Sequence, residues 1–420
     1  MRAPDHTRRV VVTGLGVISP VGNDKDSAWS NLTNGVSGIR EITKFDVSGY
    51  DQKAAGEVVG FEATEWMDPK AARRSEASLH YGVAAAKQAL VDSGFEISDE
   101  NRTEVGVVFG SGAGGQTLMI DNWTVLREKG PNRVAPTFIA NGLVDSTSGM
   151  IAIETGAIGH NMCIVSACAT GTHNVAEGAE AIRRGDCIAV ISGSTEMPLL
   201  EVAHAGFGNM RGLGNPRPGE PITSVSRPFD LTRDGFVLGE GAGSLFLEDL
   251  VLAKARGARI YAEVVGYGSA ADGWDMIQPV EAGAGSARAM KMALERRGVP
   301  ADEMDLINPH GTSTPLGDKR EAEAIWTVFG DRTPKIAISG TKSMTGHMMG
   351  AAGAFEAFAT VMSIAEQTVP VTLNYRDPDP DIDLCVATET HRREIRYGLS
   401  NNIGLGGHNG AVIFKRYDGD

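Results

Sequence analysis

The chain has 420 residues, of which 42 % are hydrophobic and 22 % are charged, a composition ordinary for a soluble globular enzyme. This length exceeds what one simple core usually supports, and it predicts two domains or two fused halves. The formal net charge of −14 argues against a nucleic acid as the main partner.

Cysteine usage and hydropathy predict a cytoplasmic protein with no membrane contact. The four cysteines, at 163, 168, 187 and 385, form neither a disulfide framework nor a CxxC zinc pattern, which indicates a reducing compartment. The first residues, MRAPDHTRRVVVTG, lack the apolar core of a signal peptide. No uncharged apolar run reaches the length of about 18 residues that a membrane span needs. The best candidate, 350–365, carries Glu356.

Short apolar strands alternate with longer helical patterns in the first half of the chain, which predicts a layered α/β fold. The expected elements are strands at 9–13, 105–109, 163–167 and 187–192 and helices at 84–93 and 169–184. Gly94 and Gly185 directly follow the two helices, where glycine commonly ends a helix.

The same rhythm restarts at about residue 258. The expected elements there are strands at 261–268, 304–307, 335–339 and 369–373 and helices at 287–297 and 350–366. Two halves with a similar order of strands and helices suggest an internal duplication, although their residues are only weakly similar. We expect the halves to cover residues 1–257 and 258–420.

Cys168 stands where a buried strand is expected to meet the N-terminus of a helix. The unpaired N–H groups and the dipole of a helix start stabilise a thiolate and lower the thiol pKa, and the same N–H groups could hold an oxyanion. Small neighbours such as Ser166 and Ala167 leave space beside the sulfur. A cysteine is more often a buried structural residue, and Cys163 inside the expected strand fits that reading well.

Two loops that carry histidine follow expected strands. NPHGTSTPLGD (308–318) contains His310, and GTKSMTGHMMGAAGA (340–354) contains Lys342 and His347. The carboxyl ends of strands are where α/β folds place their ligands. One histidine in such a loop would more often be structural, but two in matching contexts, together with a cysteine at a helix start, favour catalysis.

Metal and nucleotide sites are poorer interpretations. No HExxH pattern or close pairing of histidine and cysteine occurs, so we expect no metal. Gly110, Gly112 and Gly115 spell GxGxxG after a strand, but no second strand ending in an acid follows at the required distance.

Five motifs together resemble the β-ketoacyl-acyl carrier protein synthases, nearest to the chain-elongating type II enzymes of fatty-acid synthesis. They are SACATGTHN around Cys168, RPFDLTRDGFVLGEGAG (227–243), NPHGTSTPLGDKREAEAI (308–325), TKSMTGHMMGAAGAFEA (341–357) and GLGGHNG (404–410). The resemblance spans nearly the whole chain. It implies a thiolase fold with two duplicated βαβαβαββ-type halves in a five-layered α-β-α-β-α arrangement, the nucleophile in the first half and both histidines in the second.

The resemblance also assigns roles by position. Cys168 matches the nucleophile that carries the acyl group, and His310 and His347 match the pair that promotes malonyl decarboxylation and stabilises the enolate oxygen. The other matches are Lys342 and Glu356 in a charge network, the backbone amides of Cys168 and Leu405 as the oxyanion hole, Thr312 and Thr314 along the phosphopantetheine arm, Phe207 at the substrate entrance, and Ala113 in the deep acyl pocket. The implied reaction is a decarboxylative Claisen condensation that extends the chain by two carbons without a cofactor.

Three positions depart from the family pattern. Leu405 stands where the family usually has a gating phenylalanine, Pro309 replaces a common alanine, and Ile277 lacks a hydroxyl expected near the pantetheine. These departures leave a second interpretation open, the ketosynthase subunit of a type II polyketide or polyene synthase. Cys168 argues against a non-elongating partner subunit, which would be expected to lack the cysteine.

The resemblance further implies an acyl carrier protein as partner and a dimer, either a homodimer or a heterodimer with a related chain. Carrier proteins in this family's systems are acidic, so docking on this acidic chain requires a local basic patch. The candidates are Lys70, Arg73, Arg74, Arg127, Lys129 and Arg211. Any one of them by itself is more often a solvated surface residue.

Overall fold

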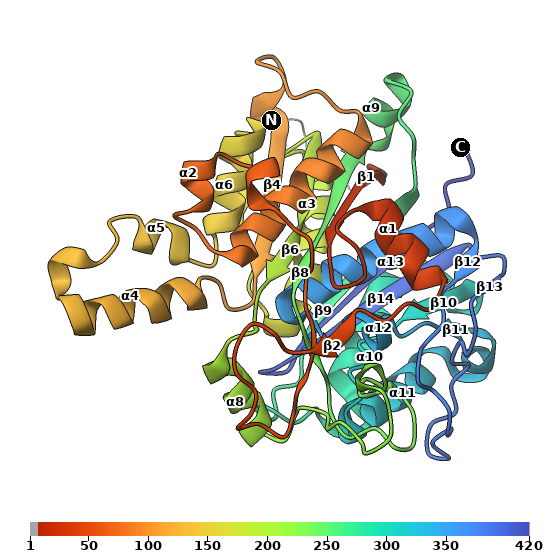
Figure 1. Ribbon diagram of the computed structural model, residues 1–420. Coiled ribbons are helices and arrows are strands. Elements are labelled where there is room, and N and C mark those ends of the chain that lie inside the picture. Colours follow the sequence, from red (N-terminus) through yellow and green to blue (C-terminus); the bar gives the residue numbers. More distant parts are fainter. Residues whose placement is uncertain (1–6, 420) are drawn as a thin grey trace.

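The protein is described by a computed structural model that covers residues 7–419 (Figure 1). The expectations for the N-terminus therefore fall partly on residues 1–6, outside the described range. The main sheet has ten strands. In spatial order they are β11 (Ala337–Ile338), β10 (Met304–Asn308), β14 (Tyr397–Gly404), β15 (His408–Lys415), β9 (Ala262–Ala271), β1 (Val10–Ile18), β8 (Gly241–Asp249), β6 (Ala189–Glu196), β4 (Val105–Ser111) and β5 (Asn161–Met162).

The two halves of this sheet repeat one topology, which confirms the expected duplication. From the outer edge to the centre, the strand order is β5-β4-β6-β8-β1 in the first half and β11-β10-β14-β15-β9 in the second. If the five strands of each half are numbered in chain order, both series become 3-2-4-5-1. In both, the second strand pairs in parallel with the third and fourth, and the remaining pairs are antiparallel. The halves join where Val10–Val12 of β1 pairs with β9. The boundary between residues 257 and 258 stays a prediction.

Helices form three layers around the two half-sheets, so the five-layered architecture is confirmed (Figure 1). The outer layer of the first half contains α3 (Ala77–Ser93) and α6 (Ser146–Thr155). The middle layer contains α7 (Thr170–Arg184) and α13 (Ala352–Glu366), which pack against each other. The outer layer of the second half contains α10 (Ala284–Glu295) and α11 (Pro315–Phe329).

The sequence explains why α7 can lie in the middle of the molecule. Its apolar stripe of Val175, Ala179 and Ile182 is fully buried, as expected for an amphipathic helix packed on a sheet. Gly185 follows with a left-handed backbone (φ 83°) and ends the helix. Gly171 lies so close to α13 that an added Cβ would collide with the backbone nitrogen of Ala354.

The segment 163–167 was expected to be a strand, and this expectation is wrong. Pairing with β4 stops at Met162, and the following residues are irregular. Side chains replace the missing strand partner: Asn174 accepts from Ile164 N–H (3.2 Å) and donates to its carbonyl (2.9 Å), and Thr170 Oγ1 accepts from Ser166 N–H (2.9 Å). Both backbone groups of Ile164 and the N–H of Ser166 are thus bonded without a ladder.

The expected strand at 369–373 is also mostly wrong, because only β12 (Thr368–Val369) forms there, paired with β13 (His391–Arg392). Pro370 has no N–H to continue the ladder.

The remaining helices and strands lie outside the main sheet and the helix layers named above. They are α1 (Lys25–Thr33), β2 (Ile39–Glu41), β3 (Ala54–Gly56), α2 (Pro69–Ala72), α4 (Gln116–Lys129), α5 (Phe138–Gly142), α8 (Glu201–Asn209), β7 (Leu238–Gly239), α9 (Leu250–Ala255) and α12 (Lys342–Thr345). In Figure 1, α4 and α5 project from the body as an arm. Between residues 7 and 419, no helix combines the length and apolar character needed to cross a membrane.

The contact between α7 and α13 yields a stability prediction. Gly171→Ala should lower the free energy of unfolding by about 1–3 kcal/mol, because the new methyl group must push two packed helices apart. Gly206→Ala in α8 is the matched control, since nothing lies within 4 Å of its added Cβ; it should be neutral or stabilising by about 0.5–1 kcal/mol. Urea unfolding measures both, and equal responses would contradict the prediction.

Candidate active site

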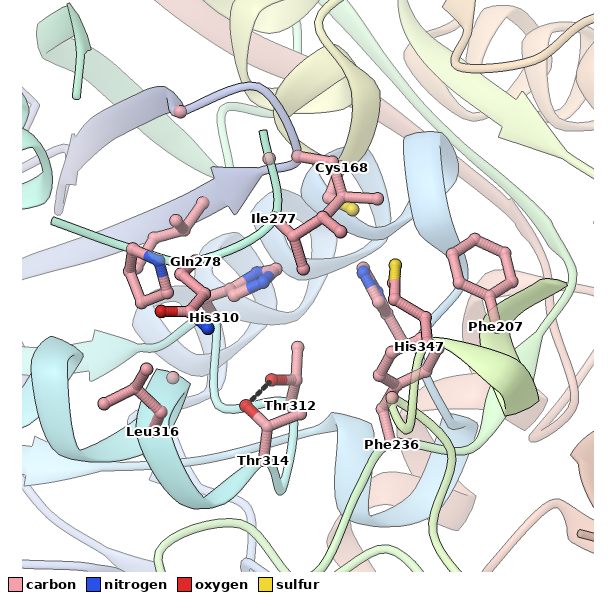
Figure 2. A pocket seen from close by; sticks show the side chains of 18 of the residues that line it. Cys168, Phe207, Phe236, Ile277, Gln278, His310, Thr312, Thr314, Leu316 and His347 are labelled. Atoms are coloured by element: carbon pink, nitrogen blue, oxygen red, sulfur yellow. Dashed lines mark hydrogen bonds between the residues drawn. The ribbon is translucent and has the colours of Figure 1, made fainter. Parts of the chain in front are cut away.

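A cavity of about 340 Å³ lies between the two halves and gathers side chains from both. Cys168, Phe207 and Phe236 come from the first half, and His310, His347 and Leu405 come from the second. Figure 2 shows Cys168, His310 and His347 around the same space. The three residues singled out from separate sequence motifs are therefore brought together.

Cys168 sits on a sharp turn directly before α7. The residues Ala167–Ala169 form one turn of 3-10 helix, and Ala167 has a left-handed backbone (φ 50°) that is uncommon for a residue with a Cβ. The turn also touches the loop between β14 and β15. A Cβ on Gly404 would stand 2.7 Å from the Ser166 carbonyl oxygen and 3.2 Å from Cys168 N, so glycine is needed for this approach.

The expectation that the helix start lowers the thiol pKa is wrong. Burial raises the pKa of Cys168 to about 11, and the N–H of Leu405 and the charge of Lys342 oppose this rise only in part. Because the side chain is only 4 % exposed, loss of solvation outweighs both favourable groups. The resting nucleophile is therefore the thiol.

His310 and His347 form a buried pair of neutral imidazoles. Their rings lie 5.2 Å apart between centroids and are nearly perpendicular. Burial, followed by the positive charge of Lys342, holds the pKa of both well below the usual histidine range. Nδ1 of His310 lies 3.5 Å from the amide nitrogen of Asn402. Because an amide nitrogen only donates, this contact favours the His310 tautomer that carries its proton on Nε2.

A buried charge network lies beneath the two histidines. Lys342 Nζ pairs with Glu356 Oε1, and Asn402 donates to Glu356 Oε2 at 2.7 Å. Burial raises the pKa of Glu356, while Lys342 and Asn402 act in the opposite direction. Both charged side chains are about 2 % exposed, and a buried pair is stable only when such extra hydrogen bonds satisfy it.

The remaining predicted pocket residues lie at the cavity wall, with one exception. Thr312 and Thr314 line the cavity with their hydroxyl oxygens 3.2 Å apart (Figure 2). Phe207 also lines it and packs edge-to-face on Phe236, with ring centroids 5.5 Å apart. Ala113 does not line this cavity: it is exposed on the loop after β4, and its N–H donates to Glu196 (3.3 Å).

Of the six basic residues expected to dock a carrier protein, only Arg211 lines the cavity. Lys70 lies in α2, Arg73 and Arg74 directly follow it, and Arg127 and Lys129 lie in the last turn of α4. All six are exposed. Their joint role stays a prediction.

Sequence reasoning missed four residues that shape the site. Glu196 is buried and accepts hydrogen bonds from Ser111 Oγ, Gly112 N and Gly350 N. Glu321 accepts from the N–H groups of His310 (2.6 Å) and Gly311 (2.7 Å). The other two are Phe236 and Asn402. A signal existed for Glu196, because a lone acid at the end of an apolar strand (CIAVISGSTE) needs partners if it is buried.

In the described part of the chain, no three side chains of His, Cys, Asp or Glu are grouped so that they could hold a metal ion. The arrangement instead offers a thiol, two N–H-bearing imidazoles and backbone amides. These groups suit nucleophilic acyl transfer with stabilisation of an anionic oxygen.

Two family models match the chain. "Beta-ketoacyl synthase, N-terminal domain" matches residues 7–253, and "Beta-ketoacyl synthase, C-terminal domain" matches residues 261–376.

Similar proteins cover nearly the whole chain. The 3-oxoacyl-[acyl-carrier-protein] synthase 2 of Vibrio harveyi is 44 % identical, over 97 % of this chain and 99 % of the relative. The enzyme of the same name from Staphylococcus aureus (strain N315) is 41 % identical, over 98 % and 99 %.

Solved structures of similar fold include ketosynthases. One is described as a type II PKS acyl-carrier protein in complex with its ketosynthase bound to the hexaketide; it is 31 % identical with a TM-score of 0.89, covering 98 % of this chain and 100 % of that one. The ishigamide ketosynthase/chain length factor is 34 % identical with a TM-score of 0.88, covering 98 % and 99 %.

The raised thiol pKa yields a test of the site's electrostatics. Alkylation of Cys168 by iodoacetamide should accelerate about tenfold per pH unit from about pH 7 to pH 9, because the thiolate fraction keeps rising below the thiol pKa. Peptide mapping by mass spectrometry follows Cys168, with exposed Cys385 as the internal reference for the reagent. A plateau near neutral pH would show that a thiolate is already present and would contradict this prediction.

Proposed function

The chain belongs to the β-ketoacyl synthase family, and we propose that it is a 3-oxoacyl-acyl carrier protein synthase that extends acyl chains by two carbons in fatty-acid synthesis. The observation that carries this proposal is the meeting of Cys168, His310 and His347 in one cavity between the halves. In this proposal the protein is an acyltransferase that carries the acyl group as a thioester on Cys168.

The first step transfers the acyl group from the carrier to the enzyme. Cys168 Sγ forms a bond to the thioester carbonyl carbon, and the bond from that carbon to the carrier sulfur breaks. The carrier thiol leaves with the proton that Cys168 gives up. The negative oxygen of the intermediate needs donors, and the N–H groups of Cys168 and Leu405 both face the sulfur.

The second step forms the new carbon–carbon bond. Malonyl thioester loses CO₂, and the electron pair of the broken bond forms an enolate. His310 and His347 donate hydrogen bonds to the enolate oxygen; neutral rings suffice for this, and burial keeps both rings neutral. The enolate carbon attacks the acyl carbon on Cys168, and the bond from that carbon to Sγ breaks. The thiolate takes up a proton from the solvent, and the 3-ketoacyl product leaves on the carrier.

The cavity fits a substrate that arrives on a phosphopantetheine arm of an acyl carrier protein. Thr312 and Thr314 offer hydroxyl groups along its wall, and exposed Arg211 stands at its rim. A net charge of −14 disfavours binding of an acidic carrier protein, so docking requires local groups of basic residues. We therefore keep Arg211, the α2 group (Lys70, Arg73, Arg74) and the α4 group (Arg127, Lys129) as the docking residues of this proposal.

We also propose that the protein works as a dimer, most simply with a second copy of itself. The sheet ends at β5, an edge strand that could pair with another chain. The chain segment that ends with β5 exposes large apolar side chains, including Met119, Trp123, Ile139, Leu143, Ile153 and Met162. Apolar patches of this kind mark protein interfaces. A related ketosynthase-like subunit is the other candidate for the same surface.

The cytoplasmic location expected from the sequence belongs to this proposal. All four cysteines are free thiols, which suits a reducing compartment.

A second candidate function, chain extension in a type II polyketide or polyene pathway, is favoured by the cavity wall. Leu405 and Ile277 both line the cavity (Figure 2 labels Ile277). The family pattern has a phenylalanine at position 405 and a hydroxyl side chain at position 277, whereas both side chains are aliphatic here. The ketosynthase chemistry is the same in both pathways, so the two candidate functions differ only in the kind of acyl chain that is extended.

Variants of the three central residues should separate the two chemical steps. Cys168→Ala should abolish acylation by acyl-carrier, whereas His310→Ala and His347→Ala should still acylate but lose about 10²–10⁴-fold in malonyl-carrier decarboxylation. Intact mass measures the first step and CO₂ release the second. Cys163→Ala is the matched control and should retain both. No acylation of the wild-type chain would overturn the proposed function.

A panel of acyl-carriers should separate the two pathways. Wild type should extend saturated primers most efficiently, and Leu405→Phe should slow long primers more than short ones, because a larger side chain narrows the cavity. Product profiling by mass spectrometry reads the outcome. Preference for polyene or poly-keto primers, or activity only beside a cysteine-less homologue, would favour the second candidate.

A further inference from the structure

His173, in the first turn of α7, lies between the turn that carries Cys168 and β15, the strand that follows the Leu405 loop. On one side, its Nδ1 lies 2.6 Å from Ser166 Oγ, in the turn that holds Cys168. On the other side, its Nε2 faces β15 just beyond the loop that holds Leu405, where a Cβ on Gly410 would stand 3.1 Å away. No role follows for His173 from the reaction described above.

The two amides belong to different parts of the chain, and their segments touch directly where Gly404 approaches the Cys168 turn. Cys168 N lies in the turn after β5, and Leu405 N lies in the loop between β14 and β15. An oxyanion hole works only when its donors are held about 2.7–3.1 Å from one oxygen position. The turn has no strand pairing to hold it, since 163–166 is irregular.

Ser166 is the point at which the turn can be held. Its N–H is fixed by Thr170 Oγ1 (2.9 Å), its carbonyl oxygen abuts Gly404, and its hydroxyl is bound by His173. Burial lowers the pKa of His173, while a contact with the backbone of Asn409 acts in the opposite direction. The ring shares a hydrogen bond with Ser166 Oγ at Nδ1, whereas Nε2 makes no hydrogen bond and packs against Gly410 of β15.

We propose that His173 is a positioning residue that fixes the Cys168 turn relative to the Leu405 loop and so sets the geometry of the oxyanion hole. This inference rests on the proposed function, since the hole matters only for acyl transfer. His173 does not line the cavity. It therefore acts through Ser166 and β15 and not on the substrate.

Two reactions of Cys168 distinguish a positioning role of His173 from a general effect on the reactivity of the thiol. Acylation by hexanoyl-N-acetylcysteamine, a small thioester that needs no carrier docking, passes through an oxyanion. Alkylation by iodoacetamide displaces iodide at a saturated carbon and forms no oxyanion. In His173→Ala and Ser166→Ala, acylation should slow about tenfold, less than the 10²–10³-fold loss for removing a donor outright, while alkylation should stay unchanged.

The double variant should be no slower than either single variant, because both remove the same contact. His80→Ala is the matched control. His80 lies in α3, outside the cavity lining, and its Nε2 is 3.1 Å from Ser75 Oγ. The rates of acylation and alkylation should both stay unchanged in this variant. Ser166→Ala keeps the test valid if His173→Ala fails to fold.

Two results would overturn the inference: acylation that is unchanged in both variants, or acylation and alkylation that fall in the same proportion. Wild-type chain that reacts with iodoacetamide but not with the thioester would instead sink the proposed function. The two failures are therefore distinguishable.

Discussion

The close contact between the N-terminal turns of α7 and α13 is the constraint on which the site depends. α7 starts at the Cys168 turn, and α13 starts just after the His347 loop. Glycines make the approach possible, because a Cβ on Gly353 would stand 2.5 Å from Thr172 N. Cys168 lies just before α7 and His347 lies just before α13, so the crossing of these two helices brings the nucleophile and the His347 loop together.

Burial then sets the protonation states of the site. Removing Cys168, His310 and His347 from water favours the neutral form of each, and the nearby charge of Lys342 reinforces this for the histidines while opposing it for the thiol. A neutral thiol beside neutral imidazoles is a resting state without unpaired buried charge. The ion pair of Lys342 with Glu356 lies beneath this layer and is held by Asn402.

Buried glutamate side chains hold in place the loops that follow the strands of the two halves. Glu196 ends β6 in the first half and accepts from Gly112 and from Gly350, so it joins the loop after β4 to the His347 loop. Glu321 of α11 performs the same task for the His310 loop through two backbone N–H groups. The cavity wall is thereby fixed by acidic side chains that do not line the cavity, which keeps the lining free for apolar and hydroxyl side chains.

The sequence by itself determined the layered α/β class, the duplication and the identities of Cys168, His310 and His347, because strand and helix periodicity and motif order are local properties of the chain. It could not determine that 163–167 lacks a strand partner, since that depends on Asn174 and Thr170 satisfying the backbone across the turn. The thiol pKa was likewise decided by tertiary burial, which outweighs the helix start. Glu196, Asn402 and His173 gain their positions only when distant segments meet, and contacts of that range leave no periodic trace in the sequence.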